Sequence, residues 1–258
     1  LPEVMPLLPF AKIKQRVPTD DYTAHTTRRE IGKNTVDNIK KTSVGLRGTS
    51  FHFFLATLNV LFARLLNVES ICIGMGDANR KQRRFANTIG YFVNVVPVQV
   101  AVAQEDTFAN VYQKTSKKAL LALSNSSVPS SVIVDTLKIQ RASSHTPIFQ
   151  VGMNYRVGEI TKMSVADFEL DYDQSVMGNP PYDISFHITP TESGTCILEV
   201  TCRDYLYTRE AAESILDMYA DLIDSFSSNT LLPARIPISP SPTVDETKLS
   251  IRRGPRLD

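Results

Sequence analysis

The segment from Phe51 to Leu66 constrains the fold more than any other part of the chain. It is almost entirely apolar, but one histidine, one asparagine and one arginine interrupt it, so it is too polar for a membrane span. Thr49 or Ser50 precedes it and suits an N-cap, which predicts a helix. Because this helix is apolar on nearly every face, we expect it in the middle of a layered α/β structure.

The rest of the chain alternates strand and helix patterns, which predicts a mixed β-sheet flanked by helices. The predicted strands are 25–31, 69–74, 91–102 and 148–155, followed by a hairpin of 184–188 and 196–202 around the turn 190–194. The other predicted helices are 35–43, 107–123, 131–138 and 208–226, the last with Thr208 as N-cap.

Composition shifts divide the chain into three parts. Residues 1–24 carry four prolines and are predicted to be an extended connector rather than a packed element. Residues 25–238 form the globular lobe, and 239–258, rich in proline, serine and charge, are predicted to be a linker or tail. The start at Leu1 suggests a chain cut from something longer, and no signal peptide is recognisable.

Charge and cysteine usage exclude several classes of function. The formal charge of +1, from 28 basic and 27 acidic residues, provides no field for nucleic acid or an anionic membrane. Cys196 and Cys202 share a predicted strand and lie roughly 20 Å apart at about 3.4 Å per residue, too far for a disulfide. With Cys72 they are predicted to be reduced thiols of a cytoplasmic protein.

No catalytic or metal-binding constellation emerges from spacing alone. The run 74–79 resembles a dinucleotide-binding glycine loop, but Asn79 replaces the third glycine, so a strand-ending turn is preferred. The basic run 80–84 suits a phosphate, although a solvated loop is more typical. HExxH and GxSxG motifs are absent, and no nucleophilic role is expected for the three thiols. We expect His52 and His187 to be hydrogen-bonded structural histidines, and Asp171 and Asp173 to be solvated turn residues.

Asn94 is out of place in the apolar run from Ile89 to Val98, which Gly90 opens as a hinge. An unpaired amide in a buried strand costs about 1–3 kcal/mol. Asn94 therefore marks either a satisfied structural hydrogen bond or a polar group aimed into a site. Pro97 cannot donate to a ladder, so this strand is predicted to lie at an edge or a bulge.

Six segments, taken in order, resemble motifs of one family. Residues 73–80 (IGMGDANR) resemble VGTPVANR, and 89–94 with Pro97 resemble IGFFVNTLPLR. Residues 128–137 resemble LPFEKLVEEL, 146–151 NPLFQVMF, 182–186 FDLTL and 203–207 YNTDLF. Together these segments are similar to the C-terminal half of a condensation domain of nonribosomal peptide synthetases. The lead-in 7–12 and the DANR run are most like the domains appended to fungal reducing polyketide synthases, such as the lovastatin nonaketide synthase and polyketide–peptide hybrids.

The resemblance implies a lobe of the chloramphenicol acetyltransferase-like fold. In the family, two such lobes form a tunnel where carrier proteins deliver acyl and acceptor groups on phosphopantetheine arms, and the acceptor amine attacks the donor thioester. The family's HHxxxDG signature is absent here, so no catalytic residue is assigned and the signature is expected upstream. The implied partners are the N-terminal lobe, acyl and peptidyl carrier proteins and other megasynthase domains, without a cofactor of this segment's own, nucleic acid or membrane.

The resemblance also suggests residue roles. It puts Asn94 near the tunnel to orient the acceptor or the thioester carbonyl, with a strand-locking hydrogen bond as the alternative. Arg80 either faces the tunnel or, as we prefer, pairs with Asp77 or Asp183. Gly90, Pro97 and Asp183 are expected to be structural or inter-lobe residues, and the crossings between lobes are expected within 80–90 and 156–181.

Two other functions stay open. The chain could be a catalytically degenerate module that only docks carrier proteins or neighbouring domains, which an upstream sequence without HHxxxDG would indicate. A free-standing acetyltransferase of the same fold is weaker, since it also needs a histidine signature.

Overall fold

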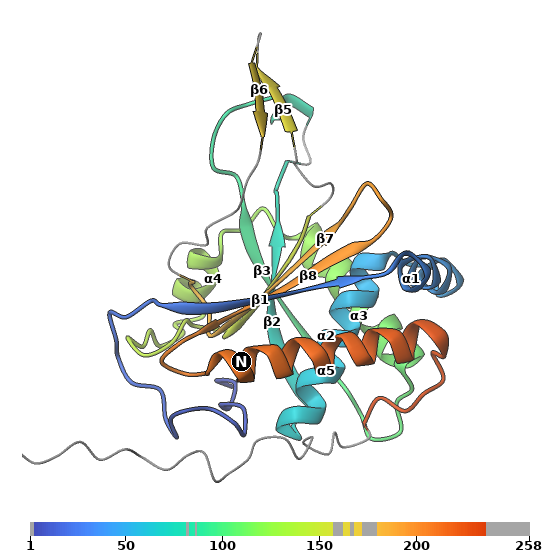
Figure 1. Cartoon of the computed structure of the whole chain (residues 1–258). Helices are drawn as coiled ribbons and strands as arrows, with labels where there is room; N and C mark the ends of the chain where they lie inside the picture. Colours follow the sequence, from blue (N-terminus) through green and yellow to red (C-terminus); the bar gives the residue numbers. More distant parts are fainter. Residues whose placement is uncertain are drawn as a thin grey trace, which may run out of the picture.

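The computed structural model describes residues 3–80, 83–85, 87–156, 162–165, 168–171 and 180–235 (Figure 1). The strands are β1 (Ala24–Ile31), β2 (Ser70–Asp77), β3 (Asn94–Ala101), β4 (Val151–Tyr155), β5 (Lys162–Val165), β6 (Phe168–Asp171), β7 (Ile184–Pro190) and β8 (Cys196–Arg203). The helices are α1 (Lys33–Gly45), α2 (Ser50–Leu66), α3 (Phe108–Ser124), α4 (Ser130–Thr136) and α5 (Arg209–Ser228), with a 3-10 turn at Arg83–Phe85. The predicted tail 239–258 lies outside the described residues.

Six strands form one mixed sheet in the order β1-β8-β7-β4-β2-β3. The pairs β2–β4 and β4–β7 are parallel and the others are antiparallel, so the predicted mixed sheet and the β7–β8 hairpin are confirmed. The hairpin turns at Gly194, whose φ of +85° suits a residue without a Cβ. β3 is an edge strand and contains Pro97 opposite Gly74, so the predicted edge position is also confirmed.

Helix α2 is the centre of the core, as its sequence predicts. Every residue from His52 to Ala63 is buried, because α3, α5 and the sheet surround the helix. The ring of Phe62 meets that of Phe186 on β7 edge-on, with centroids 6.0 Å apart. Each fully buried Leu or Phe here stabilises the fold by roughly 1.5–3 kcal/mol. The expected structural role of His52 is confirmed, since its Nδ1 accepts a hydrogen bond from the Thr49 backbone N–H in a capping box.

The N-terminal segment before β1 differs from the predicted loose connector. It has no regular secondary structure, but Met5 and Leu8 are buried in the main core. The Met5 backbone N–H donates to Gln150 Oε1 at 2.7 Å, and the Lys12 N–H donates to the Leu206 carbonyl at 2.8 Å. The prediction that this segment is not a packed element is therefore wrong, because these hydrogen bonds and the apolar side chains between Met5 and Ile13 that pack on the core fix it to the lobe.

The two faces of the sheet differ in character. The main core with α2, α3 and α5 covers the face of Phe186, whereas α4 packs on the other face through the small cluster of Cys72, Val134 and Phe149. The separate two-stranded sheet β5–β6 projects beyond the six strands, on the side opposite α2 and α5 (Figure 1). No single described helix is long and apolar enough to span a bilayer, and only α1 and α2 taken together, bent by 97°, reach the length and hydropathy required.

Candidate functional site

Asn94 begins β3 and holds the loop between α3 and α4 against it. Its side-chain amide donates to the carbonyls of Ser126 at 2.8 Å and Val128 at 2.7 Å. Its Oδ1 accepts from the backbone N–H groups of Val95 at 3.0 Å and Ser130 at 3.3 Å. Both donors and the acceptor oxygen thus have backbone partners. This geometry favours the structural alternative, while direct orientation of a substrate by Asn94 stays a prediction.

Arg80 organises the segment that leads from β2 to β3. Its guanidinium donates to the carbonyls of Phe85 and Thr88, both at 2.7 Å, and of Gly90 at 3.0 Å. It also lies over the ring of Phe92, 4.4 Å from the centroid. Backbone carbonyls therefore take the place of the expected carboxylate partner, and that prediction is wrong. The rest of the basic run 80–84 falls largely outside the described residues.

Asp183 lies at the other end of the sheet. Because β2 and β7 run in the same direction, Asp77 at the end of β2 and Asp183 just before β7 mark opposite ends. Asp183 is 2% exposed and pairs at 2.6 Å with Arg16, whose side chain is 8% exposed. Burial raises the pKa of Asp183, and the Arg16 guanidinium opposes that shift. The structure thus does not bring Asp183 together with Asn94 and Arg80, and it confirms no pairing with Arg80.

A polar row crosses the sheet on the face opposite the main core. Register places Arg28 of β1 opposite Glu199 of β8, Glu199 opposite His187 of β7, and His187 opposite Asn154 of β4. Directly paired residues share one face of a sheet, so these four side chains lie in line. The sequence did not indicate this row, because it exists only once the strand order is known.

His187 is the unusual member of this polar row. It is buried, yet neither ring nitrogen has a hydrogen-bond partner among the described residues, so the prediction of a hydrogen-bonded histidine is wrong. Burial, with a smaller effect of the nearby Arg156 charge, lowers the pKa of His187 to about 4. A neutral, buried imidazole is therefore held on this face near neutral pH.

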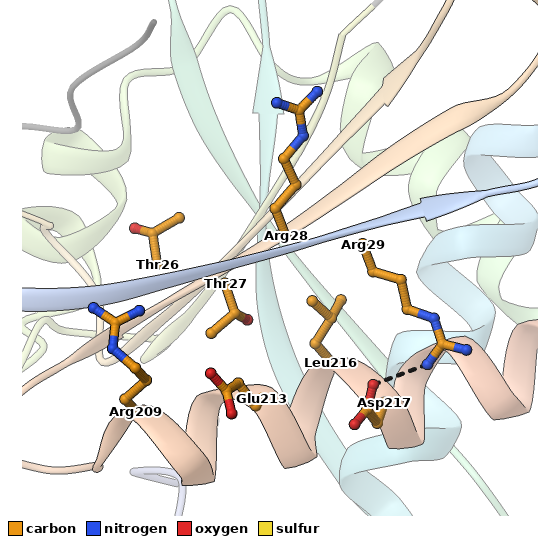
Figure 2. A pocket seen from close by; sticks show the side chains of 8 residues that line it. All are labelled: Thr26, Thr27, Arg28, Arg29, Arg209, Glu213, Leu216 and Asp217. Atoms are coloured by element: carbon orange, nitrogen blue, oxygen red, sulfur yellow. Dashed lines mark hydrogen bonds and ion pairs between the residues drawn. The ribbon is translucent and has the colours of Figure 1, made fainter.

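A groove of about 490 Å³ runs between β1 and α5 (Figure 2). Arg29 points toward α5 and pairs with Asp217 at 2.9 Å, whereas Arg28 points away from the helix. Arg209 and Glu213 line the same groove from the first turns of α5. None of the predicted site residues lines this groove, which shares only Arg28 with the polar row described above.

Nucleophilic thiols and metal ligands do not define a site in the described part of the chain. All three cysteines are buried and free, as predicted, and burial raises the pKa of each thiol to about 12. Among the described residues, no three His, Cys, Asp or Glu side chains gather as a metal-binding group.

The fold and these segments identify the class of protein. Residues 1–246 match the family model of the condensation domain, and the chain belongs to that family. It is 56% identical over 256 residues to cyclo-acetoacetyl-L-tryptophan synthase of Aspergillus oryzae, covering 99% of this chain and 7% of that protein. It is 37% identical over 258 residues to the hybrid PKS-NRPS synthetase apdA of Emericella nidulans, covering 100% of this chain and 6% of that protein. The chain thus spans a small fraction of the curated relatives that it matches.

Solved structures show the same fold. The condensation domain of the monacolin K polyketide synthase MokA superposes with a TM-score of 0.79 at 20% identity, over 91% of this chain and 55% of that chain. A four-domain nonribosomal peptide synthetase, AB3403, superposes with a TM-score of 0.80 at 15% identity, over 90% of this chain and 18% of that chain. These likenesses confirm the predicted condensation-domain fold, a mixed sheet with flanking helices.

Proposed function

We propose that this chain is the C-terminal lobe of an amide-forming condensation domain. In this proposal it helps form the tunnel in which a carrier-bound polyketide acyl thioester meets an acceptor amine on a second carrier. The family match over residues 1–246, the hybrid synthetases among the relatives and the coverage of about half of the MokA domain support it. The phosphopantetheine arms are delivered by carrier proteins, and this lobe holds no cofactor of its own.

The chemistry divides between the two lobes. The acceptor amine attacks the thioester carbonyl, the new C–N bond forms and the C–S bond breaks, while the amine loses a proton and the departing phosphopantetheine thiolate takes one up to leave as the thiol. This chain lacks HHxxxDG, so in this proposal the histidine of the other lobe performs the proton transfer. The C-terminal lobe contributes walls and positioning, which raise the rate by holding the two reactants in an attack geometry.

The extent of the match is the observation that carries this proposal most directly. Residues 1–246 match the condensation-domain family, and the common fold covers 91% of this chain but 55% of the MokA chain. The proposed remainder of the domain is a preceding lobe, with the tunnel between the two lobes. The β2–β3 segment and the β5–β6 hairpin leave the sheet at the same end, after Asp77 and Tyr155, and we propose that they make the inter-lobe crossings.

Asn94 and Arg80 then serve as positioning residues. Asn94 fixes the α3–α4 loop, and Arg80 fixes the segment through Gly90, so both shape the entrance of the tunnel from this side. Pro97 and Asp183 are structural in the same scheme: one keeps β3 at the edge, and the other anchors the segment that leads in from the preceding lobe through Arg16.

The test compares this chain with a longer protein that carries the preceding lobe. Both are mixed with an acyl-loaded donor carrier and an aminoacyl-loaded acceptor carrier, and intact-protein mass spectrometry follows the acceptor. We expect amide formation by the two-lobed protein only, and its loss when the HHxxxDG histidine becomes alanine. If the two-lobed protein binds both carriers but forms no amide, the docking module is the correct function instead.

A further inference from the structure

A second cavity, of about 350 Å³, lies at the Asp183 end of the sheet, away from Asn94. It opens between the segment before β1, the loop that precedes β4 and the end of β8. The polar groups that line it include Thr19, Tyr22, Arg141, Ser143, His145 and Arg203. No acidic side chain belongs to the described lining, so the cavity presents donors and cations.

Arg203 is the central group of this cavity. It is 7% exposed, and its guanidinium lies over the rings of Tyr22 and Tyr205, 4.8 and 5.0 Å from the centroids. Its side chain makes one hydrogen bond within the described structure, from Nη2 to the Asp21 carbonyl at 3.4 Å, and its Nε has no partner. The buried hydroxyl of Tyr205 also lacks a partner. The aromatic rings thus fix a guanidinium whose donors are largely unused.

Two carboxylates lie near Arg203, but neither accepts a hydrogen bond from its side chain among the described contacts. Asp183 is paired with Arg16 and also feels the charges of Arg203 and His145, and the exposed Asp21 feels the charge of Arg203. Arg141 adds a basic group at the cavity, although it also pairs with Asp135 at 2.7 Å. A buried guanidinium with unused donors is costly, and an anion that accepts from these donors would offset that cost.

We propose that this cavity binds a phosphate group. A guanidinium fork is matched to phosphate oxygens, and hydroxyls and basic side chains on several sides suit a tetrahedral anion better than a planar carboxylate. Thr19, Ser143 and His145 also line the cavity, so hydroxyl groups and a histidine ring surround Arg203 there. This inference is independent of the proposed function, because it needs neither a second lobe nor a condensation reaction.

The experiment measures binding of inorganic phosphate to the full chain by ³¹P NMR and by the shift in Tm, at constant ionic strength set with chloride. Arg203→Gln is expected to weaken binding by roughly tenfold or more, since it removes a charge-assisted contact. Arg29→Gln is the matched control, because Arg29 pairs with Asp217 in the separate groove of Figure 2 and should leave phosphate binding unchanged. Dimethyl phosphate in a parallel titration separates an esterified phosphate from the free ion, and saturable binding of either supports the site.

No saturable binding of either probe refutes the site, as does acetate binding as tightly as phosphate. Equal weakening in Arg203→Gln and Arg29→Gln would show only nonspecific attraction to basic charge. If Arg203→Gln does not fold, judged by circular dichroism, the double variant Arg141→Gln/His145→Ala replaces it, since both side chains are partly or fully exposed. Unchanged phosphate binding in that variant refutes the proposal.

Discussion

Replacing Asn94 tests whether this residue holds the lobe together or contacts a substrate directly. Asn94→Ala removes two short donations to the Ser126 and Val128 carbonyls and two acceptor contacts. At 0.5–1.5 kcal/mol net for a typical hydrogen bond, the two short bonds alone predict a loss of about 2 kcal/mol in the free energy of unfolding. Asn94→Asp keeps the shape but points an anion at two carbonyl oxygens, so it should cost about 3 kcal/mol.

The assay is urea unfolding at neutral pH, with Asn110→Asp as the matched control. The Oδ1 of Asn110, in the first turn of α3, likewise accepts a backbone hydrogen bond, here from the Thr107 N–H, and a carboxylate near the N-terminus of α3 is compatible with the helix dipole. That control should be neutral or stabilising. The structural reasoning would be refuted if Asn94→Asp were as stable as the parent chain while the two-lobed protein lost amide formation. Such a result would mean that Asn94 acts on the substrate and not through its loop.

Three further predictions test the packing and the electrostatics. The pKa of His187 is about 4 in the folded state and 6.5 in the unfolded state, so the unfolded state takes up the proton first as pH falls. The free energy of unfolding should therefore fall by about 3 kcal/mol between pH 6.5 and pH 4. In urea unfolding, His187→Gln should flatten this part of the pH dependence, and an unchanged slope would contradict the assignment. Arg16→Gln leaves Asp183 buried without its cation and should lower the free energy of unfolding, measured in urea, by about 3–5 kcal/mol. A decrease below about 1 kcal/mol, as for a surface ion pair, would refute the burial argument. Gly74→Ala puts a Cβ against the ring of Phe149 and should lower Tm through about 1–3 kcal/mol of overpacking, and no change in Tm would show that the ring moves freely.

The elements that sequence predicts well are those with a local signal. The continuous apolar body of α2 and the alternation of apolar and polar residues in β7 and β8 can each be recognised within one short segment. For β3, Pro97 by itself predicts the edge position. Two strand boundaries differ from the prediction: the strand predicted from Tyr91 begins at Asn94, and the strand predicted from Ile148 begins at Val151. Each strand begins only where a neighbouring strand provides hydrogen-bond partners.

The parts of the site that sequence missed depend on contacts across long separations. Arg16 and Asp183 are 167 residues apart, and nothing in the proline-rich lead-in marks Arg16 as a buried partner. The polar row across β1, β8, β7 and β4 can be recognised only when the order of the strands in the sheet is known. The family resemblance suggested Arg80, and the preferred prediction paired it with Asp77 or Asp183, but the backbone carbonyls of Phe85, Thr88 and Gly90 accept its hydrogen bonds instead. The course of the chain after Arg80 therefore determines its partners.

The measurement that tests the central proposal most directly is a single-turnover amide-forming assay on two proteins, this chain alone and the same chain joined to its preceding lobe. Intact-mass analysis of the acceptor carrier reports the product. We predict transfer of the acyl group by the two-lobed protein and none by this chain, because this sequence carries no HHxxxDG histidine. Amide formation by this chain alone at a comparable rate would contradict the assignment of the proton work to the other lobe.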